Sequence, residues 1–477
     1  MNYVRDVVEA APPTRLAMIE LTREGQRRPW SFGEVADRSA RLAGTLAAYG
    51  VRRGDVVLTF MGNRAEWVLS MLACLRLGAV ALPCTEQLRA KDLRVRLERT
   101  QPAAVVADVR NLDVLGEAQP ACPVLAVPDE ALFASDPAPI ADMAPDDGAV
   151  VIFTSGTSGE PKAALHGVRY LTGQALQARS WLDARPGDLV WCTAAAGWSK
   201  SARNTFIAPW MCGASVLLHD ARFDAVERLE LLARERVTVL CMSPTEYRVM
   251  ASRADLRPLP DLRSAVAAGE ALGADTIEHW LLATDVSVRD GFGQTETGAL
   301  TAIRPTEPMR AGSMGRPLPG IVTEIVDGEL VVDPASVPTF FLRYLDGAAP
   351  GGPWRTGDRV DVDEDGYLWH RGRLDDVIIS SGYRISPGEV EAALLSHPVV
   401  ADAAAVAAPD RERGAVVRAV VVLRDDATPS ASLIAELQDH VKRQTAPYKY
   451  PRLVEFVDEL PRTASGKLRR AALRGEG

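Results

Sequence analysis

Lysine is scarce in this chain: of 54 basic residues only six are lysine, and the other 48 are arginine. Acidic residues outnumber basic ones, so the formal net charge at pH 7 is −9. This surplus argues against non-specific nucleic-acid binding, because the phosphate backbone attracts basic surfaces. Since lysine is so rare, each one is a stronger candidate for function than usual. The six are Lys91, Lys162, Lys200, Lys442, Lys449 and Lys467.

Cysteine is sparse and scattered. None of the six residues forms a C-x-x-C pair, so the spacing predicts neither a zinc site nor a disulfide framework. We expect reduced, mostly buried thiols, as in a cytoplasmic protein. The six cysteines are Cys74, Cys84, Cys122, Cys192, Cys212 and Cys241.

No hydrophobic run is long enough to predict a membrane span. The most apolar long stretch, residues 67–84, is interrupted by Arg76 and Gly78 and ends near Pro83. That pattern favours a core helix running into a strand. The N-terminal segment has early acidic residues and no apolar core of a signal peptide, so a cytoplasmic location is expected.

Length and periodicity predict an α/β protein of more than one domain, because 477 residues exceed what one hydrophobic core usually serves. Helix-like and strand-like segments alternate, which favours a helix-covered, mainly parallel sheet. The expected helices span 31–46, with Ser31 as N-cap, and 65–77. The expected strands span 56–60, 79–82, 102–109, 149–153, 214–218, 237–242 and 263–267.

The pattern changes near residue 372. Residues 366–369 look like the end of a hairpin, and residues 372–376 are polar and turn-like. A unit of about a hundred residues follows, with its own helix starting at Pro387, strand over 416–423 and helix over 430–441. We therefore predict a large domain over 1–374 and a small one over 375–477.

The loop Thr154 to Lys162 is the most informative single stretch. It reads Thr-Ser-Gly-Thr-Ser-Gly-Glu-Pro-Lys and follows the apolar run 149–153. Its glycines allow close backbone approach, its hydroxyls are donors, and Lys162 adds a positive charge, so the loop suits phosphate. A Ser/Gly-rich surface linker is the alternative. The P-loop pattern is excluded, since no Gly-Lys-Ser/Thr occurs.

Five further motifs follow in order. They are 268–272 (Ala-Gly-Glu-Ala-Leu), 291–298 (Gly-Phe-Gly-Gln-Thr-Glu-Thr-Gly), 354–358 (Trp-Arg-Thr-Gly-Asp), 372–376 with 380–384, and 461–467 (Pro-Arg-Thr-Ala-Ser-Gly-Lys). Together they resemble the adenylate-forming superfamily of acyl-CoA synthetases, adenylation domains and luciferases. Residues 197–198, 209–210 and 446–452 are similar to its medium-chain and acetyl-type branch.

The resemblance implies a fold and a reaction. The large domain is expected to include a β-barrel-like subdomain, and the small α+β domain is expected to rotate about a hinge at Asp375. A carboxylate and ATP would give acyl-AMP and pyrophosphate, and the CoA thiol would then displace AMP. Implied cofactors are ATP, Mg²⁺ and coenzyme A, in a monomer or homodimer that binds no nucleic acid.

Nucleotide-binding roles follow from the same resemblance. Residues 154–162 would hold the β- and γ-phosphates, Phe292 would stack on adenine in place of the family's usual tyrosine, and Asp358 would bind both ribose hydroxyls. The metal ligand would be Glu296. The implied ATP and AMP contacts are Thr154, Ser155, Gly156, Thr157, Ser158, Gly159, Lys162, Gly269, Glu270, Asp290, Gly291, Phe292, Gly293, Gln294, Thr295, Asp358 and Arg373.

Lys467 is the foremost catalytic candidate, with Arg384 and Thr295 beside it. By resemblance, Lys467 reaches the carboxylate and the α-phosphate and offsets the charge that builds up when two anions react. No general base is required, because a carboxylate is already ionised at neutral pH. The implied CoA contacts are Ser381, Gly382, Tyr383, Arg413, Tyr450, Pro451 and Arg452.

The acyl pocket is expected at Trp198 and the segment 199–205, which is rich in polar residues. This favours a short, polar or functionalised acid, with Lys200 or Arg203 near the pocket. The alternative is that both side chains point to solvent or to the domain interface. The segment 320–354 is shorter than is usual for the family, so its strands are expected to be trimmed.

Three other functions are alternatives to the acyl-CoA synthetase interpretation. An amino-acid adenylating enzyme would place an Asp near 195–199, and none is there. An acyl-AMP ligase that loads a carrier-protein thiol stays open, because the thiol donor is a pantetheine in both cases. A non-enzymatic nucleotide-binding module is disfavoured by Lys467 in a lysine-poor chain.

Overall fold

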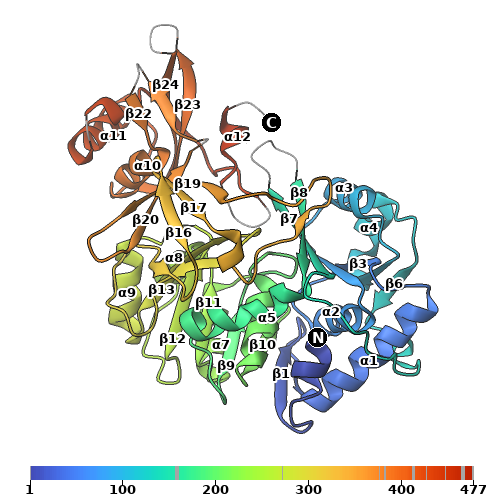
Figure 1. Ribbon diagram of the computed structural model, residues 1–477. Coiled ribbons are helices and arrows are strands. Elements are labelled where there is room, and N and C mark those ends of the chain that lie inside the picture. Colours follow the sequence, from blue (N-terminus) through green and yellow to red (C-terminus); the bar gives the residue numbers. More distant parts are fainter. Residues whose placement is uncertain are drawn as a thin grey trace. The chain divides into compact units, whose positions relative to one another are not determined.

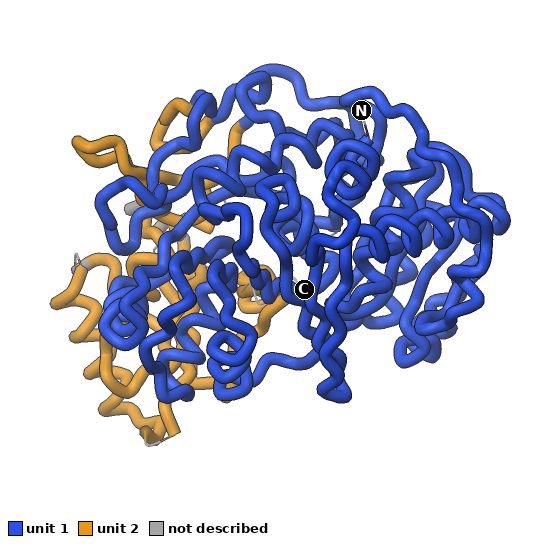
Figure 2. Tube along the Cα trace, turned by 90° about the horizontal axis from the view of Figure 1, so that it is seen from below, with its two compact units in different colours: residues 1–155, 161–322, 332–354 blue, residues 156–160, 323–331, 355–477 orange. Residues whose placement is uncertain are grey.

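The computed structural model describes residues 2–155, 161–270, 272–374, 376–380, 383–410, 414–425, 427–445, 447–463 and 468–474 (Figure 1). The chain divides into two compact units, coloured blue and orange in Figure 2. Unit 1 comprises residues 1–155, 161–322 and 332–354, and unit 2 comprises 156–160, 323–331 and 355–477. The expected domain boundary between 374 and 375 stays a prediction.

One sheet of unit 1 has seven strands among the described residues. Strands β7, β4, β3, β5 and β6 are parallel, whereas β8 and β18 run antiparallel to their neighbours. In order across the sheet the strands are β18 (Arg343–Tyr344), β8 (Pro161–Gly167), β7 (Gly148–Ser155), β4 (Val80–Cys84), β3 (Val56–Phe60), β5 (Ala104–Asp108) and β6 (Val124–Val127).

Helices cover this sheet because their apolar faces need burial. Side chains of α3 (Ala90–Thr100) and α4 (Leu112–Ala118) pack on the β3, β4 and β5 side chains in one buried cluster. The helices α1 (Phe32–Ala48) and α2 (Ala65–Leu77) pack on each other, and α2 contacts β3 and β4. As predicted, Ser31 caps α1, in a reciprocal capping box with Glu34.

The second sheet of unit 1 has nine strands among the described residues. Strands β13 through β1 are parallel, and β2, β14 and β15 are antiparallel additions at its edges. In order they are β15 (Arg316–Pro317), β14 (Gly298–Ala302), β13 (Val288–Gln294), β12 (Ser264–Ala268), β11 (Val239–Met242), β9 (Leu189–Cys192), β10 (Ser215–His219), β1 (Leu16–Leu21) and β2 (Arg27–Ser31).

Three helices share one core with this sheet: α7 (Ala225–Arg234), α8 (Pro244–Arg253) and α9 (Ala274–Thr284). Trp191, Tyr247 and Trp280 are its largest buried side chains, and the Tyr247 and Trp280 rings pack edge to face, 4.9 Å between centroids. The helices α5 (Val168–Gln177) and α6 (Ala208–Met211) both contact the π-helical turn η5 (Arg203–Ile207).

Unit 2 holds a four-stranded sheet where the barrel-like subdomain was expected, ordered β16 (Thr323–Val326), β17 (Glu329–Val332), β19 (Trp354–Val362) and β20 (Leu368–Arg373). The hairpin expected near 366–369 is confirmed by antiparallel β19 and β20. Further along are β21 (Ile378–Ser380), β22 (Tyr383–Ile385), α10 (Pro387–Leu395), β23 (Val400–Asp410), β24 (Gly414–Leu423), α11 (Ala431–Gln444), β25 (Leu453–Phe456) and α12 (Arg470–Arg474). One core joins α10 and α11 to β23 and β24.

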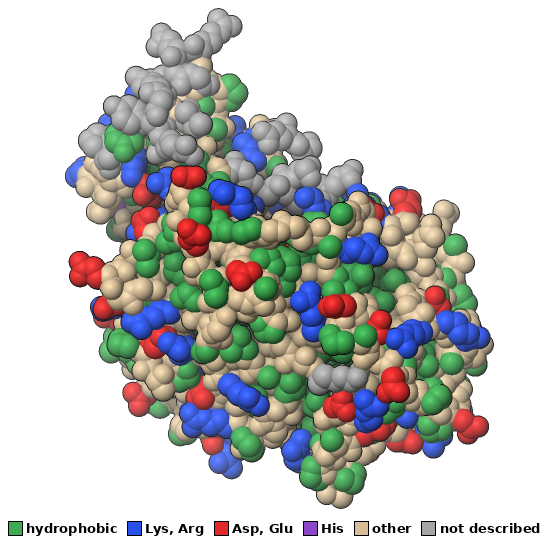
Figure 3. Space-filling model, in the orientation of Figure 1, with side chains coloured by type: hydrophobic (Ala, Val, Ile, Leu, Met, Phe, Trp, Pro, Cys, Tyr) green, Lys and Arg blue, Asp and Glu red, His purple; other side chains and the backbone are tan. Residues whose placement is uncertain are grey.

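The predicted α/β class is therefore confirmed, as are the strands and helices expected from periodicity. All six cysteines are free thiols, and four of them are buried. None of the helices in the described residues combines the length and apolar character that crossing a membrane requires. On the face shown in Figure 3, basic and acidic side chains are interspersed with apolar ones.

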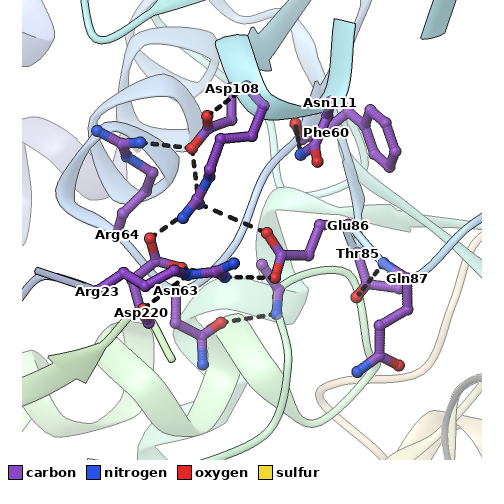
Figure 4. Close-up of polar contacts among 12 residues, drawn as sticks. Arg23, Phe60, Asn63, Arg64, Thr85, Glu86, Gln87, Asp108, Asn111 and Asp220 are labelled. Atoms are coloured by element: carbon purple, nitrogen blue, oxygen red, sulfur yellow. Dashed lines mark hydrogen bonds and ion pairs between the residues drawn. The ribbon is translucent and has the colours of Figure 1, made fainter. Parts of the chain in front are cut away.

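An ionic network ties the two sheets of unit 1 together (Figure 4). Asp108, at the end of β5, receives the Arg64 guanidinium at 2.5 Å and that of Arg110 at 2.8 Å. Arg110 also contacts Asp220, which follows β10, at 2.9 Å. Arg23, which follows β1, bridges Glu86 at 2.7 Å and Asp220 at 3.3 Å. The network thus joins the carboxyl ends of strands from both sheets.

We expect Asp108→Asn to lower the free energy of unfolding by about 1–3 kcal/mol at neutral pH, because two guanidiniums lose their shared carboxylate. Burial alone would raise the pKa of Asp108, but the Arg110 amide and the Arg64 and Arg110 guanidiniums outweigh it and hold that pKa below its ordinary value. A carboxyl with a lowered pKa stabilises the fold above its unfolded pKa of about 3.9, and loses that effect as the pH falls through its folded pKa.

Urea unfolding of both proteins at several pH values checks this. The wild-type advantage should be full at neutral pH and should shrink only below about pH 4. Asp113→Asn, an exposed carboxyl on α4, is the matched control and should change stability by less than about 0.5 kcal/mol. An Asp108→Asn protein as stable as wild type at neutral pH would contradict the proposed importance of the network.

Candidate active site

The predicted motifs gather at the carboxyl ends of neighbouring parallel strands. Gly269 directly follows β12, residues 290–294 form the end of β13, and residues 193–198 follow β9. These strands lie side by side with β11 between β12 and β9. The carboxyl edge of an open parallel sheet is the usual place for ligands, because loops from several strands meet there. The sheet topology therefore brings together motifs that are about a hundred residues apart in the chain.

The loop of residues 154–162 joins two antiparallel strands. Thr154, at the end of β7, lies directly opposite Lys162 on β8, and the Ser155 backbone pairs with Pro161. The pairing places the lysine beside the first residue of the loop. Gly156, Thr157, Ser158 and Gly159 lie outside the described residues, so their expected phosphate contacts stay predictions.

Glu296, the expected metal ligand, is held by a tyrosine. The Tyr344 hydroxyl donates to Glu296 Oε1 at 2.6 Å, and Lys162 Nζ lies 5.3 Å from the centroid of the Tyr344 ring. The Phe341 amide donates to the Glu296 carbonyl at 2.8 Å. Lys162 from the phosphate loop and Glu296 are therefore linked through one aromatic side chain, all within unit 1.

This arrangement suits magnesium bound chiefly by a nucleotide. Among the described residues, no group of three His, Cys, Asp or Glu side chains could enclose a metal ion. Mg²⁺ commonly uses one or two protein carboxylates together with substrate phosphates and waters. A single carboxylate oriented by Tyr344 fits that pattern, with a lysine nearby to share the phosphate charge.

The motif at 268–272 is anchored through Glu270. Its carboxylate accepts from the Thr245 amide at 3.0 Å and from Arg248 at 3.0 Å, both on α8. Burial would raise the pKa of Glu270, but Arg248 and Thr245 outweigh it and lower that pKa. Gly269 has a φ of +109°, a conformation that favours glycine. Glu270 thus positions the loop backbone, and it was expected to border the adenine.

Asp290 is a buried carboxyl within β13. Its Oδ1 accepts from the Gly291 amide at 2.8 Å. Burial raises the pKa of Asp290 to about 8, so the carboxyl is mostly protonated at neutral pH. The neighbouring glycines are needed for packing: a Cβ on Gly291 would lie 2.9 Å from Trp181 Nε1, and one on Gly293 would collide with the Gly298 carbonyl.

The remaining residues of this motif are half-buried. The Gln294 amide donates to Thr297 Oγ1 at 3.0 Å, and the Gln294 side-chain oxygen accepts from Trp354 Nε1 at 3.0 Å. Phe292 and Thr295 are also half-buried, so each presents part of its surface. Stacking on adenine by Phe292 and an α-phosphate contact by Thr295 stay predictions.

In unit 2, the two expected ribose contacts lie together. Asp358 on β19 and Arg373 on β20 are cross-strand partners, and Arg373 NH1 lies 3.3 Å from Asp358 Oδ2. His370 Nε2 lies 3.0 Å from the other oxygen, Oδ1. Gly357 has a φ of +71°, a conformation that favours glycine, and a Cβ there would lie 2.8 Å from Arg373 NH2. The carboxylate is thus oriented from two sides.

Other predicted residues of the small domain are described only in part. Lys467, Asp375, Ser381, Gly382 and Arg413 lie outside the described residues. Tyr383 and Arg384 are described as backbone of β22, paired with Ser380 and Ile379. The Tyr450 ring lies 4.5 Å from Lys442 Nζ and 5.0 Å from the Arg452 guanidinium carbon, and the Pro451 carbonyl accepts from Gln438.

The segment expected to form the acyl pocket is inside unit 1. Trp198 is half-buried, and its Nε1 has no hydrogen-bond partner among the described residues. Lys200 Nζ donates to the Ala268 carbonyl at 3.0 Å, beside Gly269. Arg203 is buried. Because Arg203 is buried, the alternative in which both basic side chains point to solvent is wrong, and the alternative of a domain interface stays untested.

Sequence reasoning missed Tyr344 and His370. Neither belongs to the motifs that carried the resemblance, and Tyr344 is 48 residues from the carboxylate that it orients. A pairing of β18 with β8 brings Tyr344 opposite Ala164, two residues from Lys162. For His370, strand alternation gave no signal, because residues 370 and 373 are three apart and would face opposite sides of a regular strand. A register shift between β19 and β20 at Asp358 to Val360 accompanies their common contact with Asp358.

Comparison with known proteins identifies relatives along the whole chain. Residues 5–338 match the family model described as AMP-binding enzyme, and residues 389–467 match that of the AMP-binding enzyme C-terminal domain.

Curated relatives and solved structures agree. The uncharacterized acyl-CoA ligase YtcI of Bacillus subtilis (strain 168) is 38% identical, covering 99% of this chain and 95% of its own. The human mitochondrial acyl-coenzyme A synthetase ACSM4 is 37% identical, covering 100% of this chain and 90% of its own. The crystal structure of the anthranilate CoA ligase AuaEII with anthranoyl-AMP has a TM-score of 0.90 and 28% identity, covering 100% of this chain and 97% of that one.

Proposed function

The chain belongs to the AMP-binding enzyme family and is an AMP-forming acyl-CoA synthetase, and we propose which of its residues acts in each step of the reaction. The observation that carries the proposal is the Glu296 carboxylate, held by Tyr344 beside Lys162 at the carboxyl edge of the sheets. The reaction brings together phosphate groups, a metal ion and a carboxylate, and each of these charges is stabilised by an oppositely charged side chain held in a fixed position.

The first half-reaction joins a carboxylic acid to AMP. A carboxylate oxygen attacks the α-phosphorus of ATP, the bond from that phosphorus to the bridging oxygen breaks, and pyrophosphate leaves. Lys162 and the loop from Thr154 hold the phosphates of the leaving group. Lys467, with Thr295 and Arg384, offsets the charge that develops around the α-phosphate. No proton is removed from the acid, which is already ionised.

Magnesium would be held by Glu296 together with the nucleotide phosphates. When bound, it supplies positive charge that neutralises phosphate oxygens. Tyr344 keeps the carboxylate in one orientation, so this charge has a fixed place. Lys162, on the strand β8 that pairs with β18, also neutralises phosphate charge. A lysine in this place is consistent with a metal site that has one protein carboxylate.

The nucleoside is assigned to Phe292, Glu270 and Asp358. Phe292 stacks on adenine, and the backbone beside Glu270 borders the base. Asp358 binds the ribose hydroxyls, with His370 and Arg373 fixing its carboxylate. A carboxylate accepts two hydroxyl hydrogen bonds at once, which suits a vicinal diol.

In the second half-reaction the CoA thiolate attacks the acyl carbon, the bond from that carbon to the AMP oxygen breaks, and AMP leaves. The thiol proton passes to solvent. Ser381, Gly382, Tyr383, Arg413, Tyr450, Pro451 and Arg452 are the proposed CoA contacts. Rotation of the small domain about Asp375 would exchange Lys467 for these residues.

Incubation with ATP, Mg²⁺, CoA and a panel of acids tests the function. We expect pyrophosphate release that depends on the acid, and an acyl-CoA product detected by mass spectrometry. A holo-carrier protein in place of CoA is the control, and it should accept little acyl group. Efficient loading of the carrier protein with no acyl-CoA would contradict the assignment of CoA as acceptor.

A further inference from the structure

The helix α5 and the π-helical turn η5 of unit 1 carry buried polar side chains that have too few hydrogen-bond partners among the described residues. Tyr170, Gln174 and Gln177 on α5 are spaced four and three residues apart, so they share one face of the helix. Gln177 Nε2 donates to Asn204 Oδ1 of η5 at 2.7 Å. Among the described residues, both ends of the fully buried Gln174 amide and the Asn204 Nδ2 have no hydrogen-bond partner. Buried polar groups are almost always paired, so this cluster is short of partners.

Arg203 lies in the same cluster and carries its only charge. Its side chain is on η5 and is buried, with the residue 6% exposed. Among the described residues, its Nε and NH1 have no hydrogen-bond partner, and no carboxylate forms an ion pair with it. The Tyr170 hydroxyl on α5 is a neutral hydrogen-bond partner of the guanidinium and carries no charge to balance it. A buried guanidinium without a counter-ion is strongly unfavourable, and an anion would relieve it.

The surrounding side chains do not supply that anion. His166 is fully buried, and its ring centroid lies 4.3 Å from that of Tyr170. Burial and the nearby Arg203 and Arg169 lower the pKa of His166 to about 3, so the imidazole is neutral at neutral pH. The amides of Gln174, Gln177 and Asn204 and the Tyr170 hydroxyl are neutral as well. The cluster thus holds one positive charge in neutral, hydrogen-bonding surroundings.

Arg203 is also next to the proposed chemistry. A Cβ built on Gly298 would lie 3.5 Å from Arg203 NH1 and 2.5 Å from Thr339 Oγ1. Gly298 directly follows Thr295, Glu296 and Thr297, and the Thr339 hydroxyl donates to the Thr297 carbonyl. In addition, η5 is a π-helical turn, a rare geometry that is frequent at functional sites, although η1 (Val4–Val8) and η4 (Ala178–Leu182) share it. The unpaired charge therefore lies beside the loop assigned to the α-phosphate and metal.

We propose that Arg203 binds a second anionic group on the acid, so that the enzyme favours dicarboxylic acids over monocarboxylic acids of equal length. This inference rests on the proposed function. One carboxylate of the substrate becomes part of acyl-AMP, and only a second one can stay paired with Arg203 through turnover. The unpaired amides of Gln174 and Asn204 supply further donors for the same group. A carboxylate matches the guanidinium geometrically, since it can bind in a bidentate manner.

The test compares glutarate, monomethyl glutarate and valerate, three acids of equal chain length whose far ends are anionic, neutral polar and apolar. Pyrophosphate release is measured with hydroxylamine as the acyl trap and without CoA, so the thiol step does not enter. We expect kcat/KM for glutarate to exceed that for valerate by roughly 30-fold or more, with monomethyl glutarate in between, as for a buried charge pair. Succinate with butyrate and adipate with hexanoate extend the comparison to other lengths.

Arg203→Met removes the charge and keeps the length, and Arg203→Lys keeps the charge. We expect Arg203→Met to reverse the preference toward valerate, and Arg203→Lys to retain part of it. Arg5→Met, at an exposed position, is the control and should leave the ratio unchanged. A second readout is thermal unfolding: glutarate should raise the Tm of the wild type and not that of Arg203→Met.

Equal turnover of glutarate and valerate by the wild type would overturn the inference, whatever the variants do. The same holds if Arg203→Met leaves the ratio of the two acids unchanged. Absence of pyrophosphate release with every acid, simple monocarboxylates included, would instead overturn the proposed function, and this inference with it. Turnover of monocarboxylates alone would leave the proposed function intact and refute only the role of Arg203.

Discussion

Lys467→Ala should lower the rate of acid-dependent pyrophosphate release by about 10²–10³-fold, the usual loss when one preorganised donor is removed from developing charge. Two anions react in this step, and the lysine ammonium is the group proposed to offset their repulsion. The substitution should change kcat far more than the KM for ATP, because the interaction strengthens as the bond to the α-phosphorus forms. Single-turnover measurement of pyrophosphate release checks the expectation.

The two half-reactions separate this role from a general loss of structure. Conversion of preformed acyl-AMP and CoA to acyl-CoA should stay within a few-fold of wild type in Lys467→Ala, since that step uses other residues of the small domain. Lys91→Ala, in the helix α3 of unit 1, is the matched control and should leave both steps unchanged. Unaltered adenylation in Lys467→Ala would refute the catalytic assignment.

Glu296→Gln should lower adenylation by about 10²–10³-fold at limiting Mg²⁺, because an amide replaces the one protein carboxylate proposed to bind the metal. Size and hydrogen-bonding shape are nearly preserved, so the loss reports on charge. Part of it should be recovered as the Mg²⁺ concentration rises, since weaker binding is offset by mass action. A magnesium titration of the initial rate, at saturating ATP and acid, measures both effects.

Tyr344→Phe provides the comparison. It removes the 2.6 Å hydrogen bond to Glu296 Oε1 and keeps the ring beside Lys162. We expect a smaller loss than for Glu296→Gln, with the same shift in magnesium dependence, because the carboxylate keeps its charge and loses only its fixed orientation. A Glu296→Gln enzyme with unaltered magnesium dependence would show that the metal is held elsewhere.

Local patterns in the sequence predicted most of the fold. Ser31 followed by Glu34 signals a helix start within four residues, and the structure has a capping box there. Short apolar runs such as 56–60 and 237–242 become buried strands, because a run of that length suits a strand covered on both faces. These signals work because the atoms that decide them are close together in the chain.

Only those residues of the candidate site that belong to a sequence motif could be predicted. Glu296, Lys162 and Asp358 could be proposed from their motifs, but their orienting partners could not. Tyr344 reaches Glu296 through the pairing of β18 with β8, and His370 reaches Asp358 across β19 and β20. Each contact depends on strand register, and a shift of one residue would turn the side chain to the other face.

Arg203 shows most clearly the difference between what the sequence determines and what the tertiary structure decides. The sequence by itself determined the α/β class through the alternation of helix-like and strand-like segments, the nucleotide chemistry through the phosphate-type loop, and the family through the ordered motifs. Periodicity and short spacings carry those properties. Whether Arg203 faces solvent or lies buried beside Gly298 without a counter-ion was decided by tertiary structure alone. Burial and charge pairing depend on which distant elements pack together, and α5, η5 and the loop at 295–298 meet only in the folded chain.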